Sequence, residues 1–131
     1  MRLFRIAFLA TDLGFIAYWL VTLLHLVPAE YLFNDYADPM MTAWNWSFLP
    51  LDLLVSVTGL TALALERRGD PRFRDFAVIS LAFTFASGLN ALAFWAIRRD
   101  FNVGWWLPNL YLLISPVVLF RVLQRSLQPR D

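Results

Sequence analysis

The chain has 131 residues, of which 60% are hydrophobic and 17% aromatic, and its mean hydropathy is +0.57. Soluble domains are about 45–50% apolar, so this composition excludes an ordinary soluble domain. The net charge of +1, with no separate basic patch, excludes a nucleic acid partner, and the absence of cysteine excludes disulfides, thiol redox relays and thiolate metal sites.

Four apolar runs follow one another, at about residues 6–27, 42–65, 76–97 and 105–123. Each is about as long as the 20 helical residues that cross a hydrocarbon core. They lack the alternation of barrel strands, and the first is too long for a signal peptide. We therefore expect an all-α chain, 1–131, that forms one integral membrane domain: a four-transmembrane-helix bundle.

The arginines predict the orientation of this bundle. Nine of the eleven lie in the N-terminal segment, the connection 66–75 and the C-terminal tail, whereas the connection 28–41 has none and carries Glu30, Asp35 and Asp38. The positive-inside rule then places both termini in the cytoplasm of a multi-pass protein of the bacterial inner (plasma) membrane. Four tryptophans fall at the outer helix ends, where they form an aromatic belt or line a ligand mouth: Trp44, Trp46, Trp105 and Trp106.

The second run carries a polar stripe. Asn45, Asp52, Ser56 and Gly59 are spaced i, i+7, i+11 and i+14, which places them on one helix face. A charged residue near the bilayer centre costs about 2.5–3.5 kcal/mol on insertion scales, so we expect this stripe to face protein or water. Pro50 removes a backbone donor and predicts a kink near residues 48–52.

The other runs add fewer polar groups. The third has small residues nearly all round, which predicts that it is the packing centre of the bundle. The first places Gly14, Tyr18, Val21 and His25 on one stripe, with Asp12 on the opposite side, in the cytoplasmic third, where it could anchor the helix by pairing with Arg5 or Arg74.

At 1.5 Å per residue, His25, Asn45, Asn90 and Asn109 fall in the outer half of the membrane, above Asp52. This depth predicts an outward-facing polar pocket centred on Asp52, with Tyr18 and Trp44 as further ligand contacts. Simpler interpretations are a surface hydrogen bond for His25 and an interhelical hydrogen bond for Asn90. With one histidine we expect no metal site, and we expect no cofactor.

The segments Asp12–Phe15, Tyr18-Trp19, His25–Tyr31 and Trp44–Asp52 resemble the YvaD-like family of small four-helix bacterial membrane proteins. The resemblance covers nearly the whole chain and implies topology without an activity. A fainter resemblance is to the sterol-isomerase and sigma-2-receptor superfamily, at Asp38-Pro39, Trp44, Phe48 and Asp52, with His25 as a polar partner. It implies a pocket for an apolar ligand with a cationic or hydroxyl head.

Four functions remain open from the sequence. The leading hypothesis is a pocket for a membrane lipid or another small amphipathic ligand. The second is a homodimeric proton-coupled transporter that uses Asp12, similar in size to the small multidrug resistance transporters. The third is an isomerase-like enzyme on a membrane-embedded substrate, with Asp52 and His25 as acid and base. The fourth is an assembly partner for another membrane protein.

Overall fold

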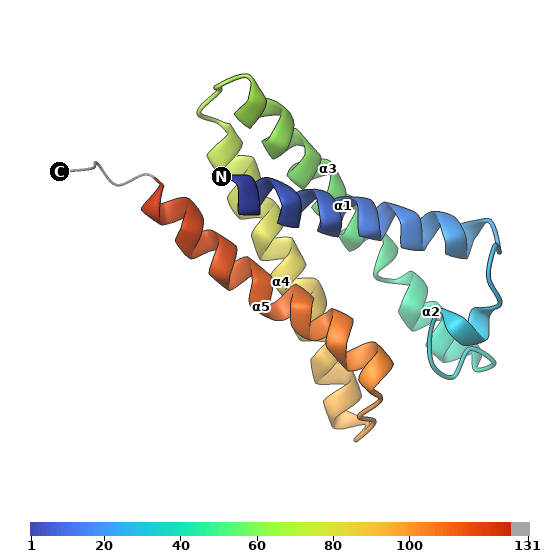
Figure 1. Ribbon diagram of the computed structural model, residues 1–131. Helices are drawn as coiled ribbons and strands as arrows, with labels where there is room; N and C mark the ends of the chain where they lie inside the picture. Colours follow the sequence, from blue (N-terminus) through green and yellow to red (C-terminus); the bar gives the residue numbers. More distant parts are fainter. Residues whose placement is uncertain (127–131) are drawn as a thin grey trace.

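The computed structural model describes residues 1–126, and these contain helices and no strand. Figure 1 shows long helices connected in chain order, with a short helix near the C-terminal end of the first. The elements are α1 (Arg2–Leu23), a 3₁₀ turn η1 (Ala29–Tyr31), α2 (Pro39–Trp46), α3 (Leu49–Arg67), α4 (Phe73–Ile97) and α5 (Val103–Arg125). Helices α1, α4 and α5, and α2 together with α3, are each long and apolar enough to cross a membrane. The all-helical prediction with four apolar segments is confirmed.

Helix α1 begins and ends about four residues earlier than predicted from hydropathy. It stops because His25 adopts a left-handed conformation, with φ of 51°. The Leu26 amide then donates to the Val21 carbonyl (3.1 Å), and the His25 amide to that of Thr22 (3.4 Å). This is the pattern of a Schellman helix end. Residues 24–27, which are apolar except for His25, therefore belong to the connection and not to the helix, a distinction that hydropathy does not make.

The predicted kink in the second run is a break between two helices. Helix α2 begins at Pro39, directly after its N-cap residue Asp38. The Asp38 carboxylate accepts a hydrogen bond from the Met40 amide (2.9 Å). Helix α2 ends at Trp46, and α3 starts at Leu49, immediately before Pro50. Because proline has no N–H, a continuous helix would lack a hydrogen bond here. The break places Asp52 in the first turn of α3, where the positive end of the helix dipole favours a carboxylate.

We call the end of the bundle that holds the N-terminus, the α3–α4 turn and the end of α5 the terminal end, and the opposite end the α2 end. The helices meet most closely at the terminal end, where an apolar cluster is buried: Phe4, Phe8, Ala62, Leu63, Ala77, Leu81, Leu119 and Leu123. Arg5 also forms a bidentate ion pair with Glu66 of α3 (2.9 and 2.7 Å). This cluster closes the bundle at one end only.

Helix α4 is the central helix, as its small residues predicted. It packs along both α3 and α5, while α1 packs on α3 and has little contact with α5. Toward the α2 end, α1 and α5 diverge (Figure 1). The bundle is therefore open between α1 and α5 in the half that was predicted to lie outward.

The connections at the two ends are also held by polar contacts. In the loop before α2, Asp35 accepts from Arg98, the residue that caps the C-terminal end of α4 (2.6 Å), and Asn34 accepts from the indole N–H of Trp105 of α5 (2.5 Å). Through these two contacts, the loop at the α2 end connects α1 to both helices on the opposite side of the opening. At the other end of the bundle, in the α3–α4 turn, hydrogen bonds from Arg72 lower the pKa of the Asp70 carboxyl to about 2.

Candidate functional site: a cavity at the open end of the bundle

A cavity of about 400 Å³ lies at the α2 end, between α1 and α5 and above α3 and α4. Ligand pockets in proteins commonly have volumes of about 300–1,000 Å³. Its lining comes from α1, α2, α3, α4, α5 and the loop before α2. The cavity exists because the helices meet at the terminal end and α1 and α5 separate toward the other.

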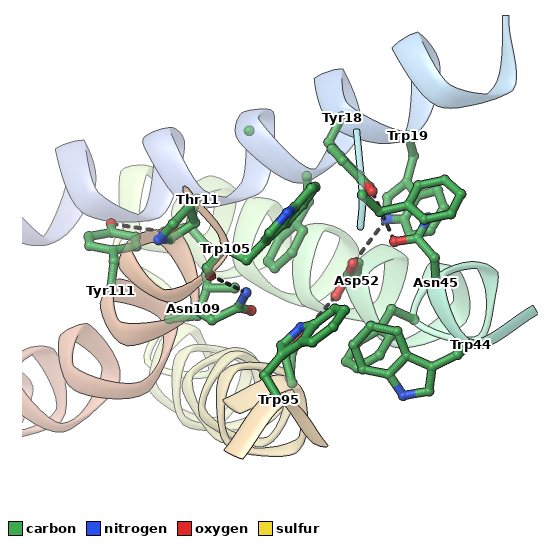
Figure 2. Close-up of a pocket in the computed structure, with 18 of the residues that line it drawn as sticks. Thr11, Tyr18, Trp19, Trp44, Asn45, Asp52, Trp95, Trp105, Asn109 and Tyr111 are labelled. Atoms are coloured by element: carbon green, nitrogen blue, oxygen red, sulfur yellow. Dashed lines mark hydrogen bonds between the residues drawn. The ribbon is translucent and has the colours of Figure 1, made fainter. Parts of the chain in front are cut away.

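Asp52 is at the polar floor of this cavity and is only 4% exposed. Its two oxygens accept from different helices: Oδ2 from the indole N–H of Trp19 (2.9 Å), and Oδ1 from the hydroxyl of Ser87 (3.0 Å). Figure 2 shows this carboxylate between α1 and α4, facing the cavity. Each oxygen has one protein donor and retains a lone pair for a second hydrogen bond.

A second polar group lies beside Asp52. The Tyr18 hydroxyl donates to Oδ1 of Asn45 (3.0 Å) and lies 3.3 Å from the main-chain oxygen of Leu32 (Figure 2). The amide nitrogen of Asn45 is buried and has no hydrogen-bond partner. A buried donor without an acceptor costs about 1–3 kcal/mol. A carboxylate with a free lone pair and an amide with free N–H groups therefore line the same cavity.

Nine of the nineteen residues that line the cavity are aromatic. The set is Phe15, Tyr18, Trp19, Phe33, Trp44, Phe48, Trp95, Trp105 and Tyr111. Several pack on one another: the Trp44 ring stacks on Phe94 at 4.1 Å between centroids and meets Trp95 and Phe48 edge to face at 5.4 and 4.9 Å. Such contacts add about 0.5–1.5 kcal/mol per pair beyond burial. The aromatic part of the walls is therefore apolar and is held in place by contacts between rings.

Five residues predicted for the pocket line the cavity, and two do not. Those that line it are Asp52, Asn45, Asn109, Tyr18 and Trp44. His25 is exposed beyond the end of α1, where it serves as the left-handed residue of the helix end. Asn90 is exposed on α4, about 100° around the helix from Ala91, which lines the cavity. The Asp52–His25 acid–base pair suggested for an isomerase is thus not assembled.

Several lining residues were not identified from the sequence. Trp19 and Ser87, the hydrogen-bond partners of Asp52, stand among other aromatic and small residues, and no spacing within their own helices distinguishes them. Trp105 was predicted for an interfacial belt or a ligand mouth, and it lines the cavity while bound to Asn34. Within residues 1–126, no three His, Asp or Glu side chains group to hold a metal ion.

These features define an all-helical chain with four apolar segments and an aromatic cavity closed at its floor by an acid. The chain belongs to a family of unknown function, DUF5360, which matches residues 4–129. It is 48% identical over 126 residues to the uncharacterised protein YvaD of Bacillus subtilis (strain 168), covering 96% of this chain and 95% of that protein. No solved structure is significantly similar to the chain. The predicted YvaD-like resemblance is confirmed.

Proposed function

We propose that this chain is an integral membrane protein that binds a small amphipathic ligand with a cationic amine head at Asp52. The observation that carries this proposal is the Asp52 carboxylate in the floor of an aromatic cavity, fixed in position by hydrogen bonds from Trp19 and Ser87. In the part of the chain that the structure describes, the arginines in ion pairs bind other acids, namely Glu66, Asp70 and Asp35. Asp52 is therefore available to a charge on the ligand.

The walls favour the same ligand chemistry. A cation over an aromatic face gains about 0.5–2 kcal/mol, more when it is desolvated, and a charge-assisted hydrogen bond to the carboxylate adds to this. The unpartnered amide of Asn45 would donate to an acceptor next to the amine, such as a hydroxyl or ester oxygen. The apolar remainder of the ligand would lie along the rings and leave the cavity between α1 and α5, toward the acyl chains.

The membrane setting follows from the four apolar segments. We place the terminal end, which carries eight of the ten arginines in residues 1–126, in the cytoplasm and the α2 end at the outer face of the inner membrane. The cavity then opens in the outer half of the bilayer. An amphipathic ligand could reach it from the lipid phase without crossing the charged inner surface.

Cysteine labelling tests this orientation, and the chain has no cysteine of its own to interfere. We expect Glu30→Cys, exposed in η1, to react with a membrane-impermeant maleimide on spheroplasts. Pro71→Cys, exposed in the α3–α4 turn, should react only after the membrane is opened. The opposite pattern would invert the topology, and the wild-type protein provides the unlabelled control.

Thermal stability in a non-ionic detergent tests the ligand class. The panel pairs ammonium amphiphiles with alcohols of the same chain length. A ligand at 100 times its Kd stabilises a protein by about 2.7 kcal/mol, so the amines should raise the Tm by several degrees, and the alcohols should raise it clearly less. Equal shifts from amines and alcohols, or no shift from either, would contradict recognition of an amine by Asp52.

A further inference from the structure

The chain buries a second acid that the outer cavity does not use. Asp12 of α1 is 1% exposed and packs against Gly59 of α3, where any side chain would collide with its carboxylate. Its Oδ2 atom has no hydrogen-bond partner. The pairing with Arg5 considered from the sequence does not occur, because Arg5 binds Glu66. Asp12 is thus buried without the donors that Asp52 has.

A small second cavity adjoins Asp12. It has a volume of about 10 Å³ and lies where α1, α4 and α5 meet. Besides Asp12, its polar lining consists of hydroxyl groups, on Thr11, Ser80, Thr84 and Ser115. A space of about 10–15 Å³ on this measure holds one water-sized particle. The cavity therefore excludes any organic ligand and any ion that keeps its hydration shell.

Three hydroxyl groups near Asp12 donate to main-chain oxygens. Ser80 donates to the Val55 carbonyl (3.2 Å), and Thr84 donates to that of Ser80 (2.8 Å). Ser56, on the α3 side, donates to the main-chain carbonyl of Asp12 (3.0 Å) and not to its carboxylate. Hydroxyls used in this way offer lone pairs to whatever occupies the cavity. Oxygen lone pairs around an unpaired carboxylate make an environment for a bare cation.

We propose that Asp12 and the hydroxyls of Ser80, Thr84 and Ser115 bind one Na⁺ ion. Oxygen ligands suit hard cations, and one carboxylate neutralises a single positive charge. Mg²⁺ would keep several waters and Ca²⁺ would need six to eight oxygens, for which this cavity has no room. K⁺ is larger than Na⁺ and fits less well.

Helix α5 also contributes Pro116 to the lining of this cavity. Proline has no N–H, so this residue brings no main-chain donor toward the cavity. The site does not depend on what occupies the outer cavity, although Thr11 lines both and is hydrogen-bonded to Tyr111 (3.1 Å).

The test compares the Tm of the purified full chain in NaCl, KCl and choline chloride at constant ionic strength. We expect a saturable rise in NaCl that the other two salts do not reproduce. Ser115→Ala, which removes one oxygen with little change in volume, should weaken the apparent Na⁺ affinity by about tenfold or more, and Asp12→Asn should abolish the response. Asp52→Asn should keep the full response, which separates this site from the outer cavity.

Each outcome bears on the site directly. A wild-type Tm that does not distinguish Na⁺ from K⁺ and choline means that the cavity holds water, and it overturns the proposal. A Na⁺ response that survives unchanged in Ser115→Ala and Asp12→Asn places the ion elsewhere and also overturns it. If Asp12→Asn does not fold, the Na⁺ titration of Ser115→Ala decides alone, since only a weakened affinity supports the site.

Discussion

Replacing Asp52 by Asn is expected to lower the affinity for an amine amphiphile by between roughly 10²-fold and several 10³-fold. Truncating one partner of a buried charge pair costs about 3–5 kcal/mol, and each 1.4 kcal/mol is a factor of ten. Asn keeps the size of the side chain and one oxygen acceptor, so either Trp19 or Ser87 retains its hydrogen bond. The fold should therefore survive the change, while the charge that recognises the ligand is lost.

The measurement is a ligand titration of the Tm, or direct calorimetry, on wild type and Asp52→Asn with an ammonium amphiphile and the matching alcohol. Glu30→Gln is the matched control, because it removes an exposed carboxylate of η1 far in sequence from the cavity floor. We expect this variant to bind like the wild type. An Asp52→Asn protein that folds and still binds the amine at wild-type affinity would contradict the proposed role of Asp52, whatever the alcohol does.

The sequence predicted the features that depend on local composition. Apolar runs of about 20 residues predicted the four long apolar segments, and Pro50 predicted the position of the break between α2 and α3. The stripe of Asn45, Asp52, Ser56 and Gly59 was predicted to face protein or water, and all four residues are buried in the protein. These successes share one cause: hydropathy and helical phase decide which face of a mostly apolar helix has to be buried against the other helices.

The features that were missed depend on how one helix is rotated against another. Helix α4 has small residues nearly all round, so its sequence does not show that Ser87 faces Asp52 while Asn90 faces outward. His25 was assigned to a helical stripe, but its left-handed backbone ends α1. Counting residues along a helix predicts how far from its end each polar side chain lies. Whether those side chains meet in one cavity depends on how the helices cross and rotate against one another, which counting does not give.

Gly88→Ala should destabilise the bundle by about 1–3 kcal/mol, the range for overpacking a close contact. A Cβ at position 88 of α4 would lie 2.7 Å from the main-chain nitrogen of Leu113 and 2.8 Å from the main-chain oxygen of Asn109, both in α5. No rotamer change relieves a clash with main-chain atoms, so α5 has to move away. Because α5 carries Trp105 and Asn109, the same change should weaken ligand binding.

Gly14→Ala is the matched control for this prediction. Gly14 also lies inside a helix, α1, and lines the cavity, but a Cβ there would have no heavy atom within 4 Å. The free energy of unfolding of Gly14→Ala should stay within about 1 kcal/mol of that of the wild type. Any change should be an increase, because alanine has a higher helix propensity than glycine. Unfolding both variants in mixed micelles measures the difference. Equal stabilities of the two variants would mean that α4 and α5 do not approach closely at Gly88. That result would contradict the placement of α5, and with it the position of Trp105 and Asn109 in the cavity wall.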